Sequence, residues 1–166
     1  GNCDIEGGEC GLFISEVAEG SADNKYIELY NPTSSPIFLS AFSMGNCANG
    51  CDVEGVFDYL TFSFPAGDIV EAGSTYVIAH PSADSLILAV ANMTYPYLSN
   101  GNDTWALLDM TGDSLAVVDI FGTLGTSAPE NGAEGWTVAG VADAALDGTI
   151  VRKASVSQGN GGDWLA

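Results

Sequence analysis

The segment from Leu12 to Pro32 constrains the fold more than any other part of the chain. It reads LFISEVAEGSADNKYIELYNP, in which two runs of alternating apolar character flank a turn at residues 20–24. A period of two is typical of β-strands, because successive side chains point to opposite faces of a sheet. Pro32 has no backbone N–H to offer a neighbouring strand, so the second run ends there. The segment therefore predicts a hairpin that opens an all-β domain.

The alternation also predicts which side chains of this hairpin share a face. In the first run, one face carries Phe13, Ser15 and Val17, and the other carries Leu12, Ile14 and Glu16. In the second run, Tyr26, Glu28 and Tyr30 oppose Ile27 and Leu29. Glu16 and Glu28 then fall on adjacent strands, where we interpret them as a cross-strand polar pair.

Four later segments resemble a known family when they are taken in order with the hairpin. They read AGSTYVIA at 72–79, LSNGNDTWALLD at 98–109, VVDIFG at 117–122 and GTIVRK at 148–153. The ordered set resembles the lamin-tail domain, which is found in nuclear lamins and in secreted bacterial proteins. The last segment is similar to the form attached to secreted nucleases and surface proteins. The resemblance implies an immunoglobulin-like antiparallel β-sandwich, with a structural role for Glu28.

Shorter elements complete the expected sandwich. Alternating patterns predict strands at 37–44 and 56–64, and short strands at 135–138 and 149–152. The expected helix covers 82–91, with Ser82 as its N-cap. Its apolar stripe is expected to pack over an open end of the sandwich and consists of Leu86, Ile87 and Val90.

The length of 166 residues suits one domain with its own core. We expect a Cys-bearing N-terminal segment at 1–11, a lamin-tail-like β-sandwich at 12–154 and a Gly-rich C-terminal segment at 155–166. Long Gly-rich loops belong to this organisation. The aromatic residues expected in the core are Phe57, Trp105, Phe121 and Trp136. The exposed-looking segment 95–97 is interpreted either as loop packing or as a contact patch.

The charge of the chain is strongly unbalanced, with 22 acidic against 3 basic residues and a net charge of −19 at pH 7. Such a chain repels phosphate backbones, and the pair Arg152-Lys153 is too small for a nucleic-acid footprint. An acidic surface favours solubility and gathers cations or basic partners, although a saline habitat explains it equally well. The sequence also has no apolar run of the roughly 18 residues that a membrane span needs.

Four cysteines, at positions 3, 10, 47 and 51, form two close pairs in the sequence. Four cysteines allow three disulfide connectivities, which the sequence does not distinguish. The simplest interpretation is two local loops, Cys3–Cys10 and Cys47–Cys51, and the alternative is a link from the chain start to the second pair. Because no C-x-x-C motif is present, disulfides are favoured over a zinc site.

Two N-glycosylation sequons begin at Asn92 and Asn102. Together with the paired cysteines, they favour a secreted, extracellular or cell-surface protein. No signal peptide is visible, so we expect Gly1 to begin a mature or trimmed product.

Catalysis has little support in this sequence. His80 is the only histidine, and its position before Pro81 predicts a capping or surface role rather than that of a general base. We therefore expect no catalytic residues and no cofactor apart from calcium. Oxygen-rich turns suit calcium, and the candidate ligands are Asn100, Asn102, Asp103, Asp109 and Asp113.

These observations favour a non-catalytic extracellular module for structure or adhesion. Edge strands of a sandwich can accept a strand from a neighbour, so a self-assembling subunit of a surface fibre or layer is our specific hypothesis. The expected partners are further copies or other extracellular protein domains. Two alternatives stay open: an accessory domain of a larger secreted enzyme such as a nuclease, and a calcium-dependent carbohydrate or surface binding module.

Overall fold

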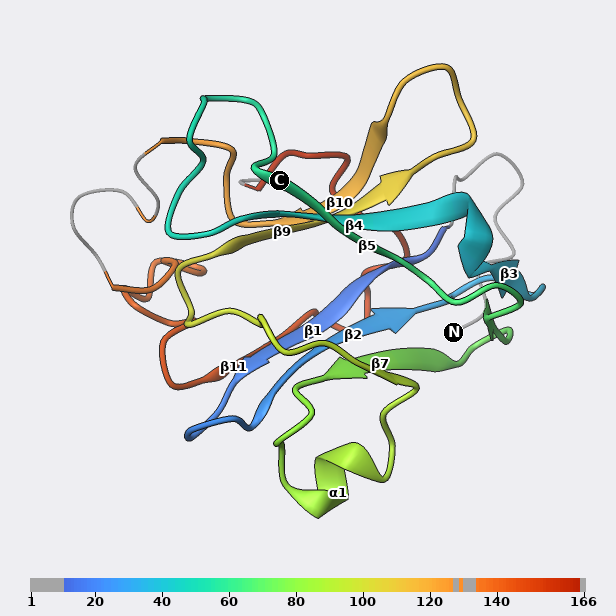
Figure 1. Ribbon diagram of the computed structural model, residues 1–166, viewed down its shortest axis with the longest axis horizontal. Helices are drawn as coiled ribbons and strands as arrows, with labels where there is room; N and C mark the ends of the chain where they lie inside the picture. The colour runs from blue at the N-terminus through green and yellow to red at the C-terminus, as the bar shows by residue number, and fades with distance from the viewer. Residues whose placement is uncertain (1–10, 127–128, 130–133, 165–166) are drawn as a thin grey trace.

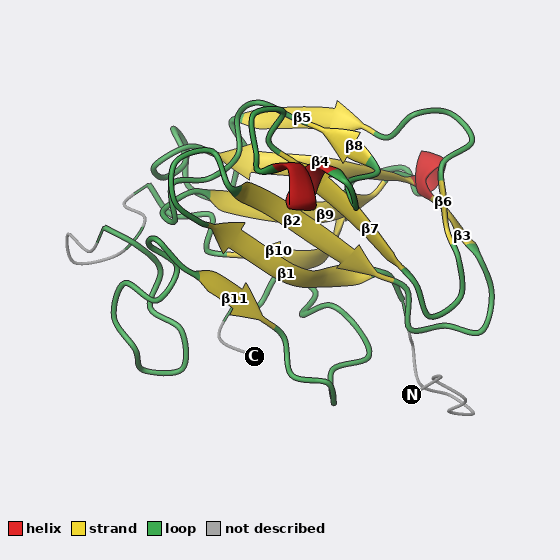
Figure 2. Cartoon of the chain, turned by 90° about the horizontal axis from the view of Figure 1, so that it is seen from below, coloured by secondary structure: helices red, strands yellow, loops and turns green. Residues whose placement is uncertain are grey.

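The computed structural model describes residues 11–126, 129 and 134–164, which form two packed β-sheets and a small two-stranded sheet (Figures 1 and 2). The strands are β1 (Phe13–Glu19), β2 (Lys25–Tyr30), β3 (Ile37–Phe38), β4 (Phe42–Cys47), β5 (Tyr59–Ser63), β6 (Ile69–Val70), β7 (Thr75–Ala79), β8 (Met93–Thr94), β9 (Thr104–Asp109), β10 (Ala116–Phe121) and β11 (Thr149–Val151). The helices are α1 (Ser85–Leu88) and a 3₁₀ turn, η1 (Leu39–Ala41).

The strand order confirms an all-β sandwich. One sheet has the order β11-β1-β2-β7-β8, and the other has the order β10-β9-β4-β5. The small sheet pairs β3 with β6. Neighbouring strands run antiparallel except for β7 and β8, which are parallel.

The core lies between the two large sheets. Trp105, Leu107 and Met44 from one sheet pack against Leu29 and Ile78 from the other, and all five are fully or almost fully buried. Burying apolar surface contributes about 25 cal/mol per Å², so these side chains supply much of the stability of the sandwich. Three of the four aromatic residues expected in the core are buried there, and Phe57 is half-buried beside a smaller cluster.

The opening hairpin forms as expected, but a bulge changes the faces of its first strand. Ile14 pairs with Leu29 and Glu16 with Glu28, so Ser15 is an extra residue in β1. An extra residue reverses the alternation beyond it. Ile14 and Val17 consequently both enter the core, so the expectation that they lie on opposite faces is wrong. Ile27 and Leu29 on β2 share the core face, as expected.

The helix is shorter than expected and begins later. Asp84, not Ser82, is the N-cap, because its Oδ1 accepts the Leu86 N–H at 2.9 Å. A four-residue helix makes about one turn and forms no continuous stripe. Leu86 is 80% exposed and Val90 64% exposed, so the expected packing of this stripe over the sandwich is wrong. Figure 1 shows α1 projecting beyond β7.

Three expected strands also differ from the observed elements. The segment 37–44 divides into β3, η1 and the start of β4, because the buried Leu39 marks where the chain passes from one sheet to another. The segment 56–64 is a strand only from Tyr59, since Val56 bridges back to Val53. The segment 135–138 contributes only an isolated bridge between Val138 and Val141. In the described part of the chain, neither helix has the length and apolar character that a membrane crossing requires.

Candidate functional site

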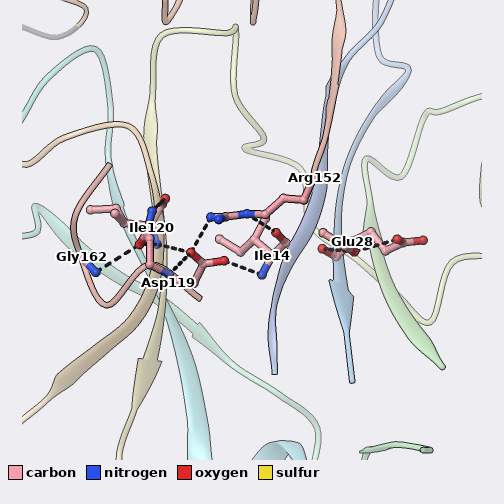
Figure 3. A network of polar contacts seen from close by, with 8 residues as sticks. Ile14, Glu28, Asp119, Ile120, Arg152 and Gly162 are labelled. Carbon is pink, nitrogen blue, oxygen red and sulfur yellow. Dashed lines mark hydrogen bonds and ion pairs between the residues drawn. The ribbon is translucent and has the colours of Figure 1, made fainter. Parts of the chain in front are cut away.

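A buried carboxylate joins the two sheets at the edge where β10 approaches β1 (Figure 3). Asp119 on β10 is fully buried, and its Oδ2 accepts the Ile14 N–H at 2.8 Å. Its Oδ1 accepts hydrogen bonds from the Asn160 N–H at 3.0 Å and from the Ile120 N–H at 3.1 Å. A register shift between Val117 and Asp119 accompanies this inward position on β10.

Arg152 supplies the positive charge that pairs with the Asp119 carboxylate. Its Nη2 lies 2.5 Å from Asp119 Oδ1, and its Nε donates to the Ile14 carbonyl at 3.1 Å. Burial raises the pKa of the Asp119 carboxyl, while the guanidinium and the N–H donors oppose that rise. The charged pair and its hydrogen bonds therefore fix the segment after β11 against both sheets.

The C-terminal segment folds back onto the same edge. Asn160 donates through Nδ2 to the Ile120 carbonyl at 2.8 Å and accepts the Ile120 N–H through Oδ1 at 3.0 Å. The ring of Trp164 lies 5.1 Å from that of Phe121 and 6.2 Å from that of Trp136. Residues beyond Gly122 thus complete one wall of this edge.

A groove of about 580 Å³ lies above this network, and we call it the edge groove. Its floor and walls come from β1, from β11 with the residues that follow it, from the 137–140 loop and from the C-terminal segment. The lining residues that matter for its chemistry are Phe121, Ile150, Val151, Arg152, Lys153 and Trp164. Two of the three basic residues of the chain therefore lie in one partly apolar groove.

Strand β11 is the last strand of its sheet, and Figure 2 shows it outermost beside β1. Gly148 C=O and Arg152 N–H both bond to β1, at 2.8 and 2.9 Å. Backbone groups alternate in direction along an antiparallel strand, so those of Thr149 and Val151 point away from β1. No other strand of the described chain pairs with β11 on this outer side, and the Val151 side chain is 62% exposed, so the edge is available to a further strand.

A second hollow, which we call the tyrosine cleft, has a volume of about 690 Å³ at one end of the sandwich. The end of β4, the start of β5, the start of β2 and the end of β7 meet there, together with residues 95–103. It is lined by Asp23, Lys25, Asn46, Ala48, Asn49, Tyr59, His80, Tyr95, Pro96, Tyr97, Leu98, Asn100 and Asp103.

Polar contacts fix the floor of the tyrosine cleft. Asp103 is buried, and its Oδ1 accepts the Asn49 N–H at 2.9 Å. Burial raises the pKa of the Asp103 carboxyl, and the bond from Asn49 opposes the rise. Lys25 Nζ donates to Asn100 Oδ1 and lies 3.7 Å from Glu19 Oε1.

His80 has a local structural role in this cleft. Its Nδ1 accepts the Ser82 N–H at 3.1 Å and lies 3.7 Å from Asp23 Oδ1. These contacts agree with the expected capping role at the end of β7. Glu16 and Glu28 are cross-strand neighbours, as expected, and each accepts a hydroxyl hydrogen bond, from Tyr26 and Ser15 respectively.

The five candidate calcium ligands do not come together. Asn100, Asn102 and Asp103 precede β9, whereas Asp109 ends that strand and Asp113 lies in the turn after it. Asp109 Oδ1 is occupied by the N–H and hydroxyl of Thr111, both at 2.7 Å. Among the described residues, no group of three or more His, Cys, Asp or Glu side chains is placed to hold a metal. Calcium binding stays a prediction that only a binding measurement can test.

The two sequon asparagines have different surroundings. Asn92 is exposed, and its Oδ1 accepts the Val77 N–H at 2.8 Å. Asn102 is half-buried, and its Nδ2 donates to Asn49 Oδ1 at 2.8 Å. Glycan occupancy at either position stays a prediction.

Cys47 and Cys51 form a disulfide, as the local-loop interpretation expects, and the loop it closes forms a wall of the tyrosine cleft. Cys3 and Cys10 lie outside the described residues.

We expect replacement of Cys47 and Cys51 by alanine to lower the free energy of unfolding by about 2 kcal/mol, since the disulfide restricts the unfolded chain. Urea unfolding of the double variant against the unreduced parent measures this change. A loss below about 0.5 kcal/mol would show that the disulfide contributes little to the stability of the fold.

The ion pair between Asp119 and Arg152 was not predicted from the sequence. The available signal was an aspartate inside an otherwise apolar strand, VVDIF, in a chain with a single arginine. A buried carboxylate needs a compensating partner, and Arg152 was the one residue best able to supply it with several donors.

Comparison with known proteins places these features in a family. The family model described as Lamin Tail Domain matches residues 8–122, which is more than half of the chain. No curated protein matches the sequence. The matched range includes Asp119 but ends before Arg152, Asn160 and Trp164, so the residues that complete the edge groove lie outside it.

Proposed function

The chain belongs to the lamin-tail-domain family, and we propose that it is a non-catalytic, extracellular structural and adhesion module that self-assembles into a surface fibre or layer. The observation that carries this proposal is the open outer side of β11 beside the edge groove. An added strand gains main-chain hydrogen bonds from such an edge, and adjacent apolar pockets supply specificity. The Cys47–Cys51 disulfide supports the extracellular location, because disulfides persist in oxidising compartments.

Charge identifies the segment that we expect to dock. The chain carries a net charge of −19, yet Arg152 and Lys153 both line the edge groove. Residues 1–10 contain three acids and two cysteines. In the proposed assembly, this N-terminal segment of one copy lies along β11 of the next, where its acids face Lys153, since Arg152 already pairs with Asp119. Complementary charge across the contact selects this register and partner.

The test is negative-stain electron microscopy with mass photometry on the unreduced full chain. We expect filaments or sheets from the parent chain. Val151→Lys places a charge on the open edge, where it opposes the addition of a strand. We expect this variant, and a chain that lacks residues 1–10, to give monomers near 17.1 kDa or slightly less.

Val90→Lys is the matched control, because Val90 is 64% exposed and Val151 62% exposed. The control adds the same charge away from β11 and should assemble like the parent. Equal melting temperatures of the two lysine variants would separate loss of assembly from loss of folding. Monodisperse parent protein at high concentration, or assembly by Val151→Lys, contradicts the proposal.

A further inference from the structure

The tyrosine cleft carries a second inference, independent of assembly through β11. Tyr97 is 75% exposed and Tyr59 58% exposed, although both line a hollow with many polar neighbours. Tyr95 lies next to Tyr97, with ring centroids 5.8 Å apart. A tyrosine ring offers an apolar face together with a polar hydroxyl, which suits contact with a ligand that is itself both apolar and polar.

The exposed ring of Tyr97 packs against Tyr95, which is in turn packed against the core. Tyr95 contacts Phe62 at a centroid distance of 4.9 Å and the fully buried Trp105 at 6.1 Å. Tyr95 therefore connects the exposed ring of Tyr97 to the core of the sandwich. Rigid aromatic side chains lose little conformational entropy on binding, which favours affinity.

The rest of the cleft offers short polar side chains rather than an apolar pocket. Amide groups come from Asn46, Asn49 and Asn100, and a carboxylate comes from the buried Asp103. Amides both donate and accept hydrogen bonds, so they match hydroxyl groups, which do the same. Asn46 Nδ2 donates to the Thr104 carbonyl at 2.9 Å. Asp103 Oδ1 accepts the Asn49 N–H, also at 2.9 Å, so hydrogen bonds hold both side chains in place.

Charge narrows the class of ligand. Lys25 lines the cleft, but its Nζ already contacts Glu19 and Asn100. The net charge of −19 opposes the binding of sulfated or uronic-acid polymers. A sugar ring has an apolar C–H face that stacks on an aromatic ring and hydroxyl groups that bond to amides. We propose that the tyrosine cleft binds neutral carbohydrate, with Tyr59 and Tyr97 as the stacking surfaces.

The experiment is isothermal titration calorimetry of the full chain with cellohexaose, maltohexaose and chitohexaose, each in buffer that contains EDTA. We expect one of these neutral oligosaccharides to bind saturably. Tyr59→Ala and Tyr97→Ala should each weaken binding about fivefold to tenfold, since each removes one stacking contact. Tyr97→Phe keeps the ring and should retain most of the affinity.

Phe38→Ala is the matched control, because Phe38 is 64% exposed and lies on β3, outside the cleft. It should bind like the parent, and melting temperatures should show that all variants fold. The absence of binding by all three oligosaccharides up to about 10 mM would overturn the proposal. Binding that persists unchanged in both alanine variants, or that appears only when calcium replaces the EDTA, would overturn it as well.

Discussion

Replacement of Asp119 by alanine is expected to lower the free energy of unfolding by about 3–5 kcal/mol, because it leaves a charged partner unpaired in a partly buried site. Arg152 would lose its contact with Asp119 at 2.5 Å. The N–H groups of Ile14, Ile120 and Asn160 would lose an acceptor at the same time. Unfolding in urea, followed by tryptophan fluorescence, measures the change.

Asp109→Ala serves as the control for Asp119→Ala. Asp109 lies on the neighbouring strand and accepts hydrogen bonds only from Thr111 in the contacts described, so its loss should cost about 1 kcal/mol. Arg152→Met, alone and combined with Asp119→Ala, completes a double-mutant cycle. A coupling energy of at least about 1 kcal/mol is expected for a direct pair. An equal decrease in the free energy of unfolding for Asp119→Ala and Asp109→Ala would show that the buried network does not stabilise the fold.

The sequence predicted the opening hairpin well because its signal is local. The alternating run in β2 and the turn after Glu19 specify the first pair of strands without reference to any distant residue. The bulge at Ser15, in contrast, has no local sequence signal. It places Glu16 opposite Glu28 and both Ile14 and Val17 in the core, an outcome set by packing between the sheets.

The candidate sites were less predictable because tertiary contacts create them. Arg152 and Asn160 lie 33 and 41 residues after Asp119 in the sequence, so no local pattern predicts their contacts with it. In the tyrosine cleft, Tyr59 comes from the start of β5, whereas Tyr97 comes from the loop between β8 and β9. The sequence identified Asp103 and Asn100 as oxygen-rich turn residues, but only the fold places them beside the tyrosines.

Gly122→Ala is the second change with a large expected effect. Gly122 has a φ of 92°, which side chains rarely adopt, and it ends the VVDIFG segment after β10. An added Cβ would lie 2.7 Å from the ring of Trp136 and 2.8 Å from Thr104 Oγ1. The clash involves a core ring whose Nε1 donates to the Asp103 carbonyl at 2.9 Å, so the ring has little freedom to move. Strain and overpacking together should cost about 3 kcal/mol or more.

Gly140→Ala separates the two contributions to that cost. Gly140 has a φ of 82°, but an added Cβ would meet nothing within 4 Å. This variant should therefore lose only about 1–2 kcal/mol from backbone strain. Thermal and urea unfolding of both variants give the difference, which measures the close approach of Trp136 to Gly122. If both variants lose the same stability, the backbone conformation alone requires glycine at 122. If Gly122→Ala loses more, the close packing of the Trp136 ring requires the absence of a side chain at position 122. The same ring contacts Trp164, which lines the edge groove.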